Sequence, residues 1–329
     1  MSKDNVQDYN QLSPDTVLSA VETVGLIPDG RLQALNSFEN RVYLIGLDDQ
    51  TEVIAKFYRP KRWTDQQILE EHDFCHELAE NDIPVVTALC FSEQQLFNFE
   101  GFRFSLFPKK GGRAMDLENY DVLEQMGRFL GRLHQVGKTK QFIHRPALTV
   151  ASYGIESREF ILSNDYIPRD LISAYESLTT ALIEQIQQAY QQVGDLHLVR
   201  THTDFHQGNI LWTEETPHIV DFDDCRSAPA IQDIWMMLSG ERNDMVAGLD
   251  AILEGYSSFC EFNHRELGLI EALRTLRLMH YYAWLAKRWN DPAFKIAFPW
   301  FNSQRCWEEH VLSLREQSAA MNEVPLALF

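Results

Sequence analysis

One stretch of the chain, residues 201–211, and the strand after it concentrate side chains that carry oxygen atoms. The stretch contains the pattern H-x-D-x-H-x-x-N, in which Asp204 and Asn209 stand at the two ends of a tight loop. Asp221 ends the following strand, 17 residues after Asp204 (221 − 204). We expect the three side chains to converge, with Asn209 and Asp221 holding Mg²⁺, a hard cation that binds carboxylate, amide and phosphate oxygens. Asp204 then remains as a base that orients an acceptor hydroxyl and takes its proton during phosphoryl transfer.

Each of these residues alone would be an ordinary turn residue, because Asp and Asn are common between strands. The joint pattern is more specific, and it favours the chemical interpretation. Asp223 could assist the metal or bind a second one, and its alternation on the strand leaves this open.

The spacing resembles that of the catalytic and metal-binding loops in the protein-kinase-like superfamily, in the branch of aminoglycoside phosphotransferases and choline kinases. This resemblance implies that Lys56 pairs with the α- and β-phosphates of ATP, and that Glu71, 15 residues later (71 − 56), is its helix partner. Glu70 is an alternative to Glu71. The helical period favours Glu71, since it shares a side with Ile68 and Phe74.

The turn at residues 36–42 departs from the glycine-rich pattern that covers the phosphates in eukaryotic-type kinases, because it contains no glycine. We expect Ser37 and neighbouring backbone amides to donate to phosphate oxygens instead, although a plain surface turn is an equal alternative.

Six further motifs, which begin at Ser37, Lys56, Ile68, Gly111, Phe142 and Asp291, extend over nearly the whole chain. Together they resemble the bacterial stress response kinase A family. This resemblance implies an ATP- and Mg²⁺-dependent kinase that phosphorylates serine and threonine on proteins, with Asp204 as proton acceptor, Asn209 and Asp221 as Mg²⁺ ligands and Ser37 as a nucleotide contact. On this interpretation the catalytic residues are Asp204 and Asp221.

The residues alone leave two other functions open. The first is a small-molecule kinase acting on choline, homoserine or an aminoglycoside, and the second is a catalytically inactive scaffold. An aromatic cage for a quaternary ammonium group would support the first, although aromatic residues at helical spacing are more often core residues. The candidate cage residues are Tyr281, Tyr282, Trp284, Trp289, Trp300 and Phe301.

The elements that must position these residues indicate an α+β, bilobal protein-kinase-like fold. We expect an N-terminal nucleotide-binding lobe at residues 1–108, with a five-stranded antiparallel sheet and one long helix, and a larger, mainly helical catalytic and substrate-binding lobe at residues 109–329. The expected strands of the sheet are 41–47, 52–58, 85–90, 95–99 and 102–107, and the long helix follows the capping box at Thr64. Helices are expected at 119–136, 168–193 and over most of the chain from 231, around a small β-rich island at 196–222.

Composition excludes several partners. The 329 residues carry a formal charge of −19, which repels phosphate backbones and anionic lipid, so we expect neither nucleic acid nor a membrane as a partner. Residues 1–10 lack the apolar core of an export signal, and the five cysteines have no metal-site spacing. We therefore expect a soluble cytoplasmic protein, with a monomer favoured.

Overall fold

The protein is described from a computed structural model, which covers residues 9–214 and 216–326. The fold is α+β, as predicted, and the chain divides into two compact units. The first unit contains Met1–Met115, Phe142–Arg145 and Gln207–Asp224, and the second contains Asp116–Gln141, Pro146–His206 and Cys225–Phe329. The prediction of a lobe boundary after residue 108 stays a prediction. Residues 1–8, which carry most of the argument against an export signal, lie outside the described part.

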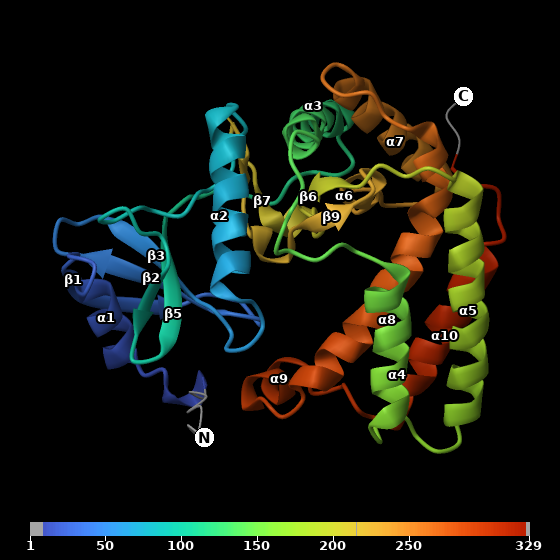
Figure 1. The fold of residues 1–329 in the computed structure, drawn as a ribbon, viewed down its shortest axis with the longest axis horizontal. Coiled ribbons are helices and arrows are strands. Elements are labelled where there is room, and N and C mark those ends of the chain that lie inside the picture. The colour runs from blue at the N-terminus through green and yellow to red at the C-terminus, as the bar shows by residue number, and fades with distance from the viewer. Residues whose placement is uncertain (1–8, 215, 327–329) are drawn as a thin grey trace. The chain divides into compact units, whose positions relative to one another are not determined.

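The first unit is built on a five-stranded antiparallel sheet with the strand order β1-β2-β3-β5-β4 (Figure 1). The strands are β1 (Pro28–Ala34), β2 (Arg41–Leu47), β3 (Glu52–Phe57), β4 (Phe97–Phe99) and β5 (Phe102–Pro108). The smaller elements of this unit are η1 (Tyr9–Gln11), η3 (Gln207–Asn209), η4 (Phe222–Asp224) and the paired strands β7 (Ile210–Leu211) and β8 (His218–Ile219).

The number of strands in the sheet was predicted correctly, but one predicted member is wrong. Residues 85–90 do not belong to the sheet; Val85 forms only an isolated parallel bridge with Ile219. The fifth strand is instead β1, which sequence analysis missed because it is polar and exposed, with a proline and a glycine that are tolerated at a sheet edge. Gly30 takes a positive φ of 92° where the register with β2 shifts.

Two helices accompany this sheet. Helix α1 (Pro14–Glu22) begins at Ser13, whose side chain accepts a hydrogen bond from the Thr16 backbone, and its apolar side packs with the sheet residues Val53, Ala55 and Phe57. Helix α2 (Asp65–Glu80) begins with the predicted capping box. Because side chains alternate along a strand, Lys56 points to the face opposite its two neighbours, toward α2.

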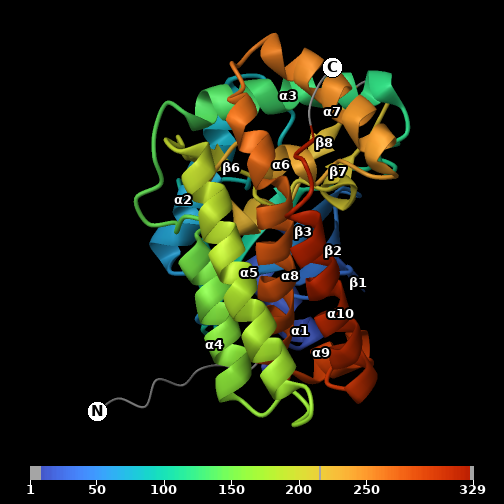
Figure 2. The ribbon, with the colours of Figure 1, turned by 90° about the vertical axis from the view of Figure 1, so that its right-hand side faces the viewer.

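The second unit is mainly helical. In Figures 1 and 2 the helices α4, α5, α8 and α10 lie side by side, and α3 packs against α7. Sequence analysis missed η2 and α4, and it placed the start of α5 four residues early. The helices are α3 (Tyr120–Gly137), η2 (Val150–Ile155), α4 (Glu156–Ser163), α5 (Ile172–Val193), α6 (Ile231–Trp235), α7 (Arg242–Ser257), η5 (His264–Leu269), α8 (Ile270–Arg288), α9 (Pro292–Ala297) and α10 (Gln304–Ala320). The strands β6 (Val199–Thr201) and β9 (Arg226–Ala228) pair beside them.

None of the helices in the described residues is both long enough and apolar enough to span a lipid bilayer.

Candidate active site

The centre of the candidate site in the first unit is the buried ammonium group of Lys56, on β3. Its Nζ donates to Asp221 Oδ1 at 3.1 Å, and it lies 3.2 Å from Asp223 Oδ1 and 3.7 Å from Glu71 Oε1. Three carboxylates from α2 and the segment after β8 therefore surround one cation.

This arrangement keeps Lys56 charged. Burial alone lowers the pKa of Lys56, but the charges of Asp223, Asp221 and Glu71 outweigh it and raise the pKa well above its usual value. A permanently protonated ammonium in a dry setting is suited to pair with phosphate oxygens, because low dielectric strengthens the attraction.

The structure distinguishes the two neighbouring glutamates of α2. Glu71 is 2% exposed and faces Lys56, as the helical period indicated. Glu70 makes different contacts, since its carboxylate accepts hydrogen bonds from the backbone amides of residues 143–145. It thereby ties the segment Phe142–Arg145 to α2.

Arg145 holds Glu71 from the other side. Its Nη2 donates to Glu71 Oε2 at 2.6 Å, its Nη1 to the Asp223 carbonyl at 2.6 Å and its Nε to the Gln67 carbonyl at 2.8 Å. The guanidinium also lies over the ring of Trp63, 4.6 Å from the centroid. Burial raises the pKa of Glu71, while the charges of Lys56 and Arg145 oppose that rise. One side chain thus connects α2 to the backbone that follows β8.

Asp223, which sequence analysis considered for a second metal, is buried among cations. It forms ion pairs with Arg62 and with Lys56, and Arg62 also donates to Asp224 Oδ1 at 2.6 Å. Burial by itself raises the pKa of Asp223, but Arg62 and Lys56 lower it to about 2. Its oxygens are engaged with protein cations, so the geometry favours a structural role.

Asn209 and Asp221 lie together at one end of the β7–β8 pair. Ile210 pairs with Ile219, and the Val220 amide donates to the Asn209 carbonyl at 3.0 Å, which brings the residues on either side close. Asp221 has a positive φ of 61°, and its side chain is 55% exposed. An exposed carboxylate held in an uncommon backbone conformation is typical of a functional position.

This donor set fits Mg²⁺. Across residues 9–214 and 216–326, no three His, Cys, Asp or Glu side chains group as a self-contained metal site. One carboxylate and one amide oxygen do suit Mg²⁺, because this ion keeps several waters and completes its shell with substrate phosphates.

Ser37 lies half-buried in the turn between β1 and β2. Arg59 braces this turn, donating from Nε to the Glu39 carbonyl at 2.9 Å and from Nη2 to the Phe38 carbonyl at 3.2 Å. The Arg59 amide donates to Asn40 Oδ1 at 3.1 Å. Side-chain bonds therefore shape a turn that lacks glycine.

Asp204 belongs to the second unit. Its Oδ1 lies 2.7 Å from Arg277 Nη1 on α8, and its Oδ2 lies 3.4 Å from His206 Nε2. Burial raises the pKa of Asp204, but the hydrogen bond from His206 and the charge of Arg277 are together stronger and hold it well below its usual range. Asp204 is therefore a carboxylate near neutral pH, which is the form a proton acceptor needs.

The backbone before Asp204 is anchored by hydrogen bonds from residues of α6. Asp233 Oδ1 accepts from the Thr203 amide at 2.7 Å, and Asp233 Oδ2 accepts from the His202 amide at 2.9 Å. Gln232 Nε2 donates to the Thr203 carbonyl at 2.8 Å. These bonds hold the β-branched Thr203 at a φ of 71°, a conformation that costs energy and persists only where the surrounding structure enforces it. His134, also bonded to Asp233, is a fully buried packing residue.

The candidate aromatic cage is mostly core. Tyr282 stacks on His310, with ring centroids 3.5 Å apart, and Phe301 is 3% exposed. Trp284 and Trp289 pack against the same core. This arrangement supports the packing interpretation.

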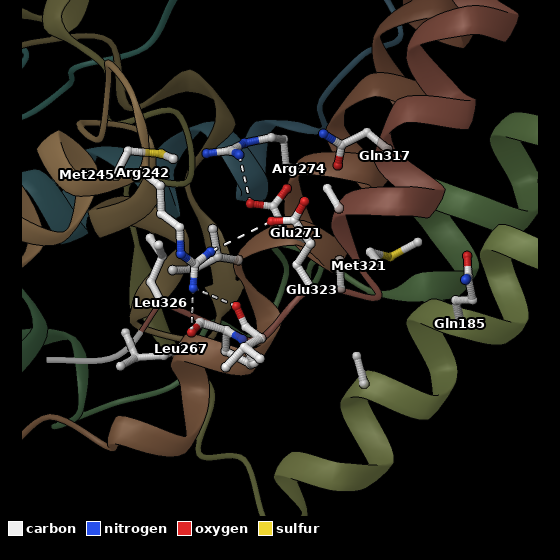
Figure 3. Close-up of a pocket in the computed structure, with 17 residues that line it drawn as sticks. Gln185, Arg242, Met245, Leu267, Glu271, Arg274, Gln317, Met321, Glu323 and Leu326 are labelled. Atoms are coloured by element: carbon white, nitrogen blue, oxygen red, sulfur yellow. Dashed lines mark hydrogen bonds and ion pairs between the residues drawn. The ribbon is translucent and has the colours of Figure 1, made fainter.

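A cavity of about 220 Å³ lies elsewhere in the second unit, between α5, α7, α8, α10 and the segment after α10 (Figure 3). Arg242 donates to the Val324 and Pro325 carbonyls beside it, and Arg274 donates to Glu271 Oε1 at 2.8 Å. Its lining in the described part of the chain includes none of the candidate site residues.

Sequence analysis missed three arginines that contact the candidate site residues: Arg62, Arg145 and Arg277. Two stand 161 and 74 residues from the carboxylates they bind, and no local period connects such positions. The one available signal was that Arg145 falls within the family motif that begins at Phe142.

Comparisons with known proteins point to one family. The model of the APH phosphotransferase enzyme family matches residues 31–270. Stress response kinase A of Escherichia coli (strain K12) is 42% identical over 320 residues, which cover 97% of this chain and 97% of that protein. The serine/threonine protein kinase RdoA of Salmonella typhimurium is 40% identical over 325 residues, which cover 99% of this chain and 98% of that protein.

Solved structures establish the same fold. Amicoumacin kinase hAmiN, in complex with AMP-PNP, Ca²⁺ and Ami, superposes with a TM-score of 0.73 at 20% identity, over 96% of this chain and 95% of that chain. A choline kinase from Cryptosporidium parvum Iowa II gives a TM-score of 0.59 at 12% identity, over 93% of this chain and 96% of that chain.

Proposed function

The chain belongs to the APH phosphotransferase enzyme family and to the stress response kinase A family, and we propose that this ATP-dependent kinase phosphorylates serine and threonine hydroxyls of proteins. The observation that carries the proposal is that the chain contains two sets of groups, each arranged within its own unit. In the first unit, three carboxylates surround the buried, charged ammonium group of Lys56. In the second unit, the ionised Asp204 lies on a loop whose backbone is hydrogen-bonded to Asp233.

The roles follow from the chemistry of transfer. The acceptor hydroxyl gives its proton to the Asp204 carboxylate, its oxygen forms a bond to the γ-phosphorus, and the bond from that phosphorus to the β-phosphate oxygen breaks to release ADP. Lys56, held by Glu71, binds the α- and β-phosphates, and Ser37 with nearby amides contacts the nucleotide. Residues 1–108 would form the nucleotide lobe and residues 109–329 the catalytic and substrate lobe.

Magnesium is the proposed metal, with Asn209 and Asp221 as its protein ligands. When bound, it would neutralise charge on the phosphates. We therefore assign catalytic roles to Asp204 and Asp221. Asp223 has a structural role instead, in which its carboxylate pairs with Lys56 and Arg62.

The acceptor is proposed to be a protein because a relative at 40% identity over 99% of this chain is named a serine/threonine protein kinase. A small alcohol such as choline, homoserine or an aminoglycoside is the second candidate, supported by the fold shared with small-molecule kinases. We also propose a cytoplasmic monomer that acts without nucleic acid or membrane.

The test uses γ-labelled ATP with Mg²⁺, offered in parallel to a dephosphorylated cell extract and to a panel of small alcohols and aminoglycosides. Label on serine and threonine of proteins is the expected result. Label only in small molecules would overturn the protein acceptor. No transfer in any arm would favour an inactive scaffold.

A further inference from the structure

We infer that Arg277 selects the acceptor, and that the preferred hydroxyl lies next to an acidic side chain of the substrate polypeptide. This inference rests on the proposed function and deepens it by naming the substrate class. The juxtaposition behind it is the ion pair between Arg277 on α8 and the proposed base Asp204, at 2.7 Å.

The ion pair occupies one of the two oxygen atoms of the proposed base. Arg277 Nη1 contacts Asp204 Oδ1, while His206 Nε2 faces Oδ2 at 3.4 Å. An acceptor hydroxyl must donate to this carboxylate to be oriented and deprotonated. A substrate that draws the guanidinium away therefore makes the base available.

The guanidinium can leave the pair toward solvent, because the Arg277 side chain is 43% exposed, whereas the Asp204 side chain is 26% exposed and stays in place. An ion pair with one solvent-exposed partner is weakened by water and salt, so a competing carboxylate can replace Asp204 as the partner of Arg277. A carboxylate on the substrate would give the guanidinium a new bidentate partner, and arginine geometry suits this exchange. A cationic acceptor would instead meet a like charge beside the base.

The charge of α8 supports an anionic group. The whole chain has a formal net charge of −19. In contrast, α8 has one acidic side chain, Glu271, and four basic ones: Arg274, Arg277, Lys287 and Arg288. The overall charge acts mainly at long range, and salt screens it beyond about 8–10 Å. The contact at Asp204 is far shorter, so the local guanidinium decides the preference.

The same face of α8 continues into exposed aromatic side chains. Tyr281, one turn after Arg277, is 37% exposed and stacks on Trp284 with ring centroids 5.8 Å apart. Ring contacts continue through Phe298 to Trp300, which is 44% exposed. A polypeptide segment can cover this row with apolar side chains while it presents its hydroxyl and acidic group at Asp204.

The test compares serine peptides that differ at one position beside the serine, which is Glu, Gln or Lys. For the unmodified protein, kcat/KM should favour Glu over Lys by on the order of fivefold. Arg277→Gln should abolish the preference, Arg277→Glu should reverse it, and Arg277→Lys should retain most of it.

Lys287→Gln is the matched control, because it removes the same charge from the same helix about 15 Å away along the axis. It should leave the preference unchanged, and ATP-analogue binding should confirm that each variant is folded. An equal Glu/Lys ratio in the unmodified protein and the Arg277 variants would overturn the inference alone. Label in small alcohols but in no peptide would overturn the proposed function and the inference with it.

Discussion

Arg145 and Lys56 share one carboxylate: Glu71 has its Oε2 2.6 Å from Arg145 Nη2 and its Oε1 3.7 Å from Lys56 Nζ. The closer cation is therefore the arginine, although the lysine is the proposed phosphate contact. Arg145 holds the carboxylate of Glu71 in place. The ammonium group of Lys56 is then oriented by three carboxylates, those of Glu71, Asp221 and Asp223.

Replacing Arg145 tests whether this bracing supports nucleotide binding. Arg145→Ala leaves a buried carboxylate without its nearest cation, and breaking such a pair costs about 3–5 kcal/mol. We expect a lower unfolding temperature and a raised KM for ATP. Arg145→Lys keeps the charge, but its single nitrogen cannot reach the three acceptors that Nε, Nη1 and Nη2 of the arginine contact separately, so it should rescue only part of both effects. Full recovery of both by lysine, or an unchanged KM in the alanine variant, would contradict the bracing role.

Asp204→Asn separates chemistry from nucleotide binding. Asparagine keeps the shape but cannot accept the proton, so kcat should fall by roughly 10²–10⁴. The Kd for AMP-PNP with Mg²⁺ should remain similar, because the proposed base acts on the acceptor. Single-turnover transfer and a binding titration measure the two quantities. Comparable turnover in the variant would remove Asp204 from this role.

Two nearby aspartates should respond in opposite ways. Asp221→Asn should weaken Mg²⁺-dependent nucleotide binding and change the unfolding temperature little, because its side chain is 55% exposed. Asp223→Asn should instead lower the unfolding temperature, since it leaves Arg62 and Lys56 buried with less negative charge. Thermal unfolding and a Mg²⁺ titration of nucleotide binding would test both. An unchanged metal dependence in the Asp221 variant would refute the ligand assignment.

His310 makes stability depend on pH. It is 1% exposed, and burial lowers its pKa to about 3. The unfolded chain binds the proton near pH 6.5, so the folded form gains full stability above that value and loses it as the pH falls toward 3. The loss between pH 8 and pH 5 is about 2 kcal/mol. His310→Phe should remove that part of the pH dependence of the unfolding free energy measured in urea. An identical pH dependence in the two proteins would show that His310 binds its proton equally in the folded and unfolded chain, which contradicts the lowered pKa.

The contact between α3 and α7 depends on glycine. A Cβ on Gly127 would lie 2.0 Å from the Ile252 carbonyl oxygen, and one on Gly255 would lie 1.9 Å from the Glu124 carbonyl oxygen. Gly127→Ala should therefore separate the helices and cost about 1–3 kcal/mol. Gly268→Ala is the control, because its Cβ would meet only Val193 at 3.7 Å. Equal unfolding temperatures for the two variants would contradict this packing argument.

Local signals in the sequence predicted much of the first unit. The capping box at Thr64 gave the start of α2, and the helical period distinguished Glu71 from Glu70. β1 was missed because its residues are mostly exposed and polar, so no alternation of apolar residues marks it. Residues 85–90 were assigned wrongly to the sheet, since apolar content does not reveal which partner a segment pairs with.

The site was predictable only where its residues stand in a motif. Asp204, Asn209 and Asp221 were found from their spacing and Lys56 from the family resemblance, and the roles of all four stay proposals. Arg277 was missed because it lies on a helix 73 residues after Asp204 (277 − 204) and follows the ordinary pattern of a charged helix face. Contacts of this kind are decided by tertiary packing, which no short-range pattern encodes.

The most direct measurement is a crystal structure of the protein with AMP-PNP and Mg²⁺, with Mn²⁺ as an anomalous substitute. We expect metal coordinated at about 2.1 Å by oxygens of Asn209 and Asp221, Lys56 on the α- and β-phosphates, and Asp204 outside the metal shell. Metal held by other residues, or a nucleotide that does not touch Lys56, would contradict the proposed site.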